Sequence, residues 1–252
     1  MLPANWWFHG SQLMNMKVLR FVFVALLIAG VARAQQPEVP RTENYLEEIR
    51  AELKKVFPKN RTINLVFHGH SVPTGYWSKS EVHTLESYPQ LLLRKLKCEY
   101  PYAVINVITT SIGGEWAEKG QTRFVEDVFP HKPDVVFIDY ALNDMGIGLE
   151  RSETAWSKMI EDALARNIKV ILVTPSPDQR QDITSEENVL ARHAAQIRKL
   201  AAKYHVGLAD PFARFQQIAK EKGSVKEYMS HINHPNEKGH DMIAEELFKW
   251  FR

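Results

Sequence analysis

Five short apolar runs, each containing β-branched residues, recur along the chain and alternate with stretches whose apolar residues recur at helical spacing. A run that is apolar throughout suits a strand buried on both faces, and strands that alternate with helices form parallel sheets covered on both sides. The pattern therefore predicts a three-layer α/β/α fold around a mainly parallel, five-stranded sheet. The strands are expected at 63–67, 103–109, 134–140, 169–174 and 205–209, and the main helices near 84–98, 120–129, 153–166, 185–203 and 237–251.

The first 34 residues have the features of a secretory signal peptide. A basic segment, Met16–Arg20, precedes the 11 apolar residues Phe21–Val31, and Ala32-Arg-Ala34 has the small-x-small form of a cleavage site. The apolar run is shorter than the about 20 residues that cross a bilayer. We therefore expect a start at Met16, preceded by extra residues 1–15, cleavage near Ala34, and a secreted or periplasmic protein without stable membrane insertion.

The remaining chain divides into a short polar segment and one domain. Residues 35–60 contain three prolines and one amphipathic helical pattern at 42–56, and we interpret them as a linker with an N-terminal helix. Residues 61–252 contain all the alternating strand and helix patterns and are expected to form one folded domain.

Charge and cysteine content exclude further classes of protein. Residues 1–34 hold three of the 32 Lys and Arg residues and no Asp or Glu, so 29 basic and 30 acidic residues remain after cleavage. This balance does not favour nucleic-acid binding. Cys98 is the only cysteine, so no internal disulfide can form, and its helical surroundings predict a half-buried side chain.

The loops that follow the predicted strands carry the polar residues. Ligands of open parallel sheets bind beyond the carboxyl ends of the strands. Ser71 follows the first strand, Gly114 the second and Asn143 the third, and His234 precedes the last helix. Serine acyl transfer needs a nucleophile, a base and donors for the oxyanion. The loops therefore predict Ser71 as nucleophile, His234 as base, and an oxyanion hole formed by the N–H groups of Ser71 and Gly114 and the side chain of Asn143.

The order of these blocks resembles the SGNH hydrolases, also called GDSL-like lipases and esterases, over about residues 61–252. That family has a Gly-Asp-Ser block, a later Gly, a Gly-x-Asn-Asp block and an Asp-x-x-His-Pro block. The matching segments here are Gly69-His70-Ser71, Gly114, Ala141-Leu142-Asn143-Asp144 and His231-Ile232-Asn233-His234-Pro235. The resemblance implies a flavodoxin-like fold and hydrolysis of esters with no metal or organic cofactor, and it assigns the same roles to Ser71, Gly114, Asn143 and His234.

Three positions depart from the family pattern. His70 replaces the Asp before the nucleophile, Ala141 replaces a Gly, and His231 stands where the triad acid is expected. A triad carboxylate fixes the tautomer of the base and stabilises its imidazolium, and in a serine protease an amide at that position lowers kcat about 10⁴-fold. His231 can accept a hydrogen bond but supplies no negative charge. We expect a backbone carbonyl, or a side chain from another loop, to hold His234 in a Ser–His dyad or an atypical triad. The carboxylates in the other strand-end loops are Glu115, Asp144 and Asp178.

Aromatic residues near the loops suggest the substrate. Tyr76 and Trp77 follow the nucleophile loop, and Trp116 follows the Gly-Gly loop. Aromatic side chains at the mouth of a pocket can stack on sugar rings. A secreted enzyme also meets polysaccharides, so these residues predict a small-molecule or glycan ester as substrate, and a carbohydrate esterase that removes acetyl groups.

Two other functions are compatible with the same residues. His68, His70, His231 and His234 could together hold a zinc ion that activates water. The chain could instead be a relative that kept the pocket, lost the acid and binds carbohydrate without catalysis. A chelator and a serine-directed phosphonate distinguish the first alternative, and hydrolysis above a Ser71→Ala background distinguishes the second.

Overall fold

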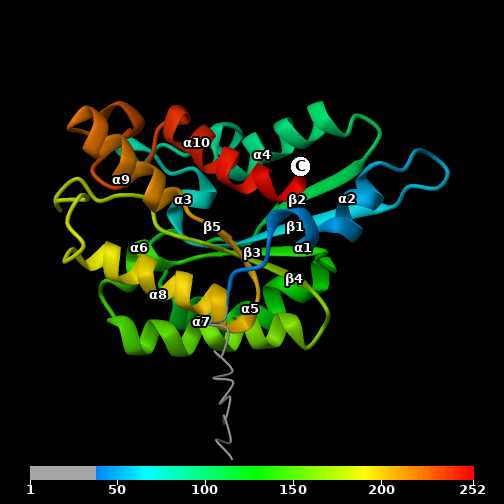
Figure 1. The fold of residues 1–252 in the computed structure, drawn as a ribbon, viewed down its shortest axis with the longest axis horizontal. Helices are drawn as coiled ribbons and strands as arrows, with labels where there is room; N and C mark the ends of the chain where they lie inside the picture. Colours follow the sequence, from blue (N-terminus) through cyan, green and yellow to red (C-terminus); the bar gives the residue numbers. More distant parts are fainter. Residues whose placement is uncertain (1–37) are drawn as a thin grey trace, which may run out of the picture. The chain divides into compact units, whose positions relative to one another are not determined.

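The computed structural model describes residues 38–252, and the structural statements below concern that part of the chain. Its five strands are all parallel and form one sheet in the order β2-β1-β3-β4-β5 (Figure 1). This confirms the predicted five-stranded parallel sheet, whereas the predicted signal peptide lies outside the described residues. The strands are β1 (Thr62–Gly69), β2 (Val104–Thr109), β3 (Val135–Asp139), β4 (Lys169–Val173) and β5 (Gly207–Ala209).

Helices cover both faces of the sheet (Figure 1). Successive side chains of a strand point to opposite faces, so β1 sends Phe67 into one hydrophobic cluster and Val66 into the other. No helix in the described part of the chain is both long and apolar enough to cross a membrane. One face carries α4 (Tyr88–Glu99), α9 (Pro211–Lys222) and α10 (Glu237–Phe248), and the other carries α5 (Ala117–Val128), α7 (Leu149–Leu164) and α8 (Val189–Tyr204).

The segment before β1 packs on the hydrophobic cluster that contains Phe67. The helix expected at 42–56 is divided into α1 (Thr42–Tyr45) and α2 (Glu47–Leu53). The Tyr45 hydroxyl donates to the Val170 carbonyl and accepts from the Val170 N–H, both at 3.0 Å, which ties α1 to β4. The buried side chains of this segment are Leu46, Ile49 and Leu53.

Two features differ from the sequence expectations. Helix α9 was not expected, although Asp210 caps it by accepting from the Ala213 N–H at 3.1 Å and Gly223 ends it with a φ of +73°. Cys98 is exposed rather than half-buried, because α4 turns its leucines toward the sheet and Cys98 toward solvent. The short helices at the edge that carries the strand-end loops are α3 (Ser71–Thr74) and α6 (Ala141–Asp144).

Gly120 in α5 allows the helix to approach the ring of Tyr140. A Cβ at Gly120 would overlap the Tyr140 ring, so Gly120→Ala should lower the free energy of unfolding by about 1–3 kcal/mol, the usual cost of overpacking. In an exposed helix interior the same substitution stabilises by roughly 1 kcal/mol. Urea unfolding measures the difference. The matched control is Gly146→Ala, because a Cβ there would make only an ordinary 3.6 Å contact. An unchanged or raised stability of Gly120→Ala would contradict this packing.

Candidate active site

Ser71 lies at the carboxyl end of β1, where the chain turns into α3. Gly69 is required at this turn, because a Cβ there would lie 2.5 Å from the Asp139 carbonyl oxygen of the neighbouring strand β3. His70 is the N-cap of α3, and its Nδ1 accepts from the Val72 N–H at 3.2 Å. The Ser71 side chain is thereby fixed in a largely buried position at the sheet edge, where the sequence predicted a nucleophile.

His234 meets Ser71 from the other end of the chain. The distance between Ser71 Oγ and His234 Nε2 is 2.8 Å. The loop 230–236, called the histidine loop, is held by its own backbone, because the His234 carbonyl accepts from the Ser230 N–H at 2.9 Å and from the His231 N–H at 3.2 Å. Burial, and then the neighbouring His70 and His231, lower the pKa of His234 to about 4. Its imidazole is therefore neutral near pH 7 and can accept the proton of Ser71.

His231 does not support His234 in the way a triad acid would. Its side chain is exposed, and the two ring centroids are 6.2 Å apart. His234 Nδ1 is buried and has no hydrogen-bond partner among residues 38–252. The expected backbone carbonyl or loop side chain is therefore not found within this part of the chain. Ser71 and His234 therefore form a pair without a third member among the described residues, the arrangement expected of a Ser–His dyad.

The three loop carboxylates considered for this role bind elsewhere. Glu115 accepts from Arg123 Nε at 3.0 Å and from the Tyr140 hydroxyl at 2.9 Å. Asp178 pairs with Arg180, which accounts for both of its carboxylate oxygens. Asp144 binds three other donors, and its contacts support Asn143 instead.

Asp144 is a buried carboxylate with three donors. Ala117 N–H donates at 2.7 Å, Ser152 Oγ at 2.6 Å and Trp156 Nε1 at 2.8 Å. Burial raises the pKa of Asp144 and these donors oppose that rise. The cluster joins α6 to α5 and α7, and so fixes the backbone next to Asn143.

Asn143 and Gly114 lie on the loops that flank the nucleophile loop. Asn143 Nδ2 donates to the Glu115 carbonyl at 2.9 Å, which joins the loop after β3 to the loop after β2. The Ile112 N–H donates to the Gly69 carbonyl at 3.1 Å, which joins the loop after β2 to the end of β1. Gly114 is exposed and has a φ of +76°, a conformation that favours glycine. Since β2, β1 and β3 are neighbours, the three loops end at one edge of the sheet.

Of the three predicted aromatic contacts, Tyr76 is the one beside the dyad. Its ring centroid is 6.5 Å from that of His234, and a Cβ at Gly113 would lie 3.2 Å from its ring. Trp77 instead stacks on His83, with ring centroids 3.9 Å apart. Both residues lie in the segment 75–87 that connects α3 to α4.

Trp116 contacts a neighbouring charge. Lys119 Nζ lies 4.2 Å from the centroid of its ring. The indole face on that side is therefore occupied by a cation of the same chain.

His68 belongs to the core rather than to the site. Its Nδ1 lies 2.8 Å from Thr110 Oγ1, and its Nε2 donates to the Gly120 carbonyl at 3.0 Å. Both nitrogens are thus used within the fold, and the four-histidine zinc site considered above is not assembled. Among residues 38–252, no group of three or more His, Cys, Asp or Glu side chains is placed to hold a metal ion.

Asp139, the last residue of β3, was not selected from the sequence. Its Oδ1 lies 3.3 Å from His70 Nε2, and both side chains are buried. The signal was an acidic residue ending an otherwise apolar strand, Val-Val-Phe-Ile-Asp. Such a residue faces the edge where the strand-end loops gather.

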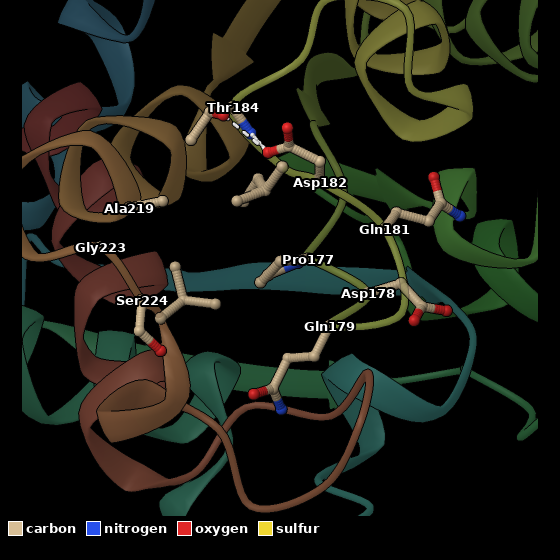
Figure 2. Close-up of a pocket in the computed structure, with 11 residues that line it drawn as sticks. Pro177, Asp178, Gln179, Gln181, Asp182, Thr184, Ala219, Gly223 and Ser224 are labelled. Carbon is tan, nitrogen blue, oxygen red and sulfur yellow. Dashed lines mark hydrogen bonds between the residues drawn. The ribbon is translucent and has the colours of Figure 1, made fainter.

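A pocket of about 200 Å³ lies beside the histidine loop (Figure 2). Gln179, on its rim, ties the two together, because its N–H donates to the Ile232 carbonyl and its side chain to the His231 carbonyl, both at 2.9 Å. Neither Ser71 nor His234 lines the pocket. Its lining residues are Pro177, Asp178, Gln179, Gln181, Asp182, Ile183, Thr184, Ala219, Gly223, Ser224 and Val225.

Comparison with known proteins places this geometry among esterases. Residues 67–242 match the model of the GDSL-like lipase/acylhydrolase family. An acetylxylan esterase of Geobacillus stearothermophilus is 21% identical over 201 residues, which cover 73% of this chain and 90% of that protein.

Solved structures show the same fold at low sequence identity. An acetyl xylan esterase, AlAXEase, superposes with a TM-score of 0.62 and 23% identity, covering 74% of this chain and 98% of its own. A two-domain esterase active on acetylated mannans superposes with a TM-score of 0.66 and 19% identity. The match covers 83% of this chain and 52% of that esterase's chain. The predicted fold class is thereby confirmed.

The buried histidines should make stability depend on pH. Burial lowers the pKa of His68 and His234 to about 4 and that of His240 to about 3, whereas an unfolded histidine titrates near 6.5. Between these pKa values the unfolded chain binds more protons than the folded chain. The contribution of these histidines to the free energy of unfolding is therefore full above about pH 6.5 and is lost as the pH drops toward 4. His68 alone accounts for up to about 3 kcal/mol of that loss.

Chemical denaturation between pH 7 and 4.5 measures this loss. His68→Gln should flatten the pH dependence, because that side chain cannot gain a proton on unfolding. A free energy of unfolding that is constant over this range, or a slope that His68→Gln leaves unchanged, would contradict the expectation.

Proposed function

The chain belongs to the GDSL-like lipase/acylhydrolase family, and we propose that it removes acetyl groups from a carbohydrate by a serine mechanism. Membership confirms the family resemblance and makes the protein a hydrolase of ester bonds. The observation that carries the mechanism is the 2.8 Å contact between Ser71 Oγ and His234 Nε2. Both residues stand in blocks that match the family pattern.

In the acylation step, Ser71 Oγ attacks the acetyl carbonyl carbon while its proton moves to His234 Nε2. The tetrahedral intermediate collapses with expulsion of the sugar alkoxide, which takes the proton from His234. This leaves an acetyl ester on Ser71. In deacylation, a water molecule gives a proton to His234 and attacks that ester, and acetic acid leaves as Ser71 takes the proton from His234; the acid then ionises to acetate in solution.

The oxyanion of both intermediates would be met by three donors. These are the N–H groups of Ser71 and Gly114 and the side chain of Asn143. An Asn amide carries two N–H groups, and the one that binds the Glu115 carbonyl orients the other. Donors fixed before the reaction stabilise developing charge without reorganisation, and one such donor contributes about 10²–10³ in kcat. Asn143 is fixed in this way by its neighbours.

Several observations support an acetylated carbohydrate as substrate. The similar proteins named above act on acetylated xylan or acetylated mannans. The Tyr76 ring lies beside His234, where it can pack on a sugar ring. Trp77 stacks on His83, and Lys119 lies over one face of Trp116. Either indole could therefore bind sugar only with the part of its ring that these residues leave uncovered. A secretory leader at residues 1–34 would deliver the enzyme to such polysaccharides.

Ser71→Ala and His234→Ala should each lower kcat for p-nitrophenyl acetate by at least about 10³-fold, because the nucleophile and base act as one unit. Release of acetate from acetylated xylan should fall equally. Cys98→Ala, on the exposed face of α4, is the control expected to keep full activity.

Two results would contradict the proposal. If the wild type hydrolyses no faster than Ser71→Ala yet binds acetylated xylan, the chain is a carbohydrate-binding relative. A strong preference for long-chain nitrophenyl esters over acetate esters would contradict the sugar-acetate assignment.

His231→Asp should raise kcat by about 10- to 100-fold at pH 7, because it places a carboxylate at the triad-acid position of a site that lacks one. The histidine loop should keep its shape, since the His231 contact to the His234 carbonyl is made by the backbone. The added negative charge should also raise the pKa of His234 and move the acid limb of the pH–rate profile to higher pH. His231→Asn, which has similar size and no charge, should change little. An activity of His231→Asp no higher than that of the wild type would contradict the expected gain.

A further inference from the structure

A line of close polar contacts leads from the buried Asp139 to Ser71. Asp139 Oδ1 lies 3.3 Å from His70 Nε2, and His70 Nδ1 lies 3.5 Å from Ser71 Oγ. Only 4% of Asp139 and 1% of His70 are exposed to solvent. Ser71 is therefore flanked by two imidazoles, and the one that has a carboxylate beside it is His70 rather than His234.

The contacts of His70 assign its tautomer. Its Nδ1 accepts from the Val72 N–H, so the ring proton is on Nε2 and faces Asp139. Asp139 Oδ2 accepts from the Tyr88 hydroxyl at 3.0 Å. Burial, and then the charge of Asp139, raise the pKa of Tyr88 well above its usual value, so the hydroxyl remains a donor. Asp139 thus lies between a phenol that donates to its Oδ2 and an imidazole whose Nε2 is 3.3 Å from its Oδ1.

We infer that Asp139, acting through His70, supplies the Ser71–His234 pair with the negative charge that a triad carboxylate next to His234 would otherwise supply. Asp139 and His70 are positioning residues in this scheme, because neither contacts the substrate. The inference rests on the proposed function. When His234 accepts the proton of Ser71 it becomes a cation whose Nδ1 has no partner in the described chain. A buried negative charge nearby offsets the cost of that cation.

A purely structural role does not explain the pair. Capping α3 requires only an acceptor at position 70, which Asn, Asp or Ser would provide. Burying an imidazole and a carboxylate together costs desolvation energy. Moreover, His70 Nε2 and Asp139 Oδ1 are close but make no well-aligned hydrogen bond. The fold accepts this cost at the residue that precedes the proposed nucleophile. This is consistent with selection for a charge beside Ser71.

The other ionisable groups that act on His70 are known from the structure. Asp144 of α6 and His234 of the histidine loop both interact electrostatically with it. Asp144 is held by its three donors. The removable negative charge that touches His70 is therefore Asp139.

Asp139→Asn tests the inference, because it removes the charge while keeping the size of the side chain and an acceptor for Tyr88. We expect kcat for p-nitrophenyl acetate to fall about 10- to 100-fold with little change in KM, somewhat less than the cost of deleting a donor that touches the oxyanion. His70→Asn, which can still cap α3, should lower kcat by a similar factor, and the double variant should be no worse than either single one. The matched control is Asp134→Asn at the opposite end of β3, which should leave kcat unchanged.

The pH–rate profile separates an electrostatic role from a structural one. Loss of a negative charge should lower the pKa of His234 further and move the acid limb to lower pH. Loosened packing would instead hydrate His234 and move the acid limb to higher pH. An unchanged limb, or a shift to higher pH, would overturn the inference.

A second carboxylate provides the decisive comparison. In the His231→Asp background the base has its own acid, so Asp139→Asn should cost less than about fivefold in kcat. An equal cost in both backgrounds would overturn the inference. If Asp139→Asn does not fold, as judged by circular dichroism, His70→Asn carries the same comparison.

Ser71→Ala, measured alongside, separates the two proposals. If Ser71→Ala hydrolyses as fast as the wild type, the proposed function fails. If it is inactive while Asp139→Asn keeps full kcat, the role of Asp139 alone fails.

Discussion

The close pairing of β1 with β3 is the constraint on which the site depends. At Gly69 the two strands approach so closely that no side chain fits between the turn and the Asp139 carbonyl. Because β1 lies between β2 and β3, this approach brings the loops that carry Ser71, Gly114 and Asn143 to one edge. A bulkier residue at the turn would separate β1 from β3 and move the nucleophile away from its donors.

Local patterns were sufficient to predict the sheet and the residues at its edge. Apolar runs identify buried strands, and the position of Ser71 after the first of them follows from chain order alone. Helix α9 was not predicted, although two of its end signals, the Asp210 cap and Gly223, are present in the sequence. The exposure of Cys98 depends on which side of α4 packs against the sheet. That orientation is determined by contacts with segments that are distant in sequence.

The support of the base could not be predicted, because it depends on contacts between distant segments. The loop carboxylates that could have supported His234 are each bound by other donors. Arg123 of α5, for example, donates to Glu115. Asp139 contacts His70 only because β3 pairs with β1. A lowered pKa does not distinguish the proposed base from the other histidines either. Burial lowers the pKa of His68 and His240 as it does that of His234, although both are core residues.

Within residues 38–252, His234 Nδ1 has no hydrogen-bond partner, and this affects which tautomers the population of molecules contains. An imidazole without an acceptor at Nδ1 is not tied to one tautomer, and only the form with its proton on Nδ1 can accept from Ser71. In the proposed mechanism, each turnover therefore starts from an equilibrium between a competent and an idle form. The observed rate is the intrinsic rate multiplied by the competent fraction. Because Nδ1 is buried, a bound substrate cannot reach it, and the competent fraction is set by the protein around the ring rather than by the substrate.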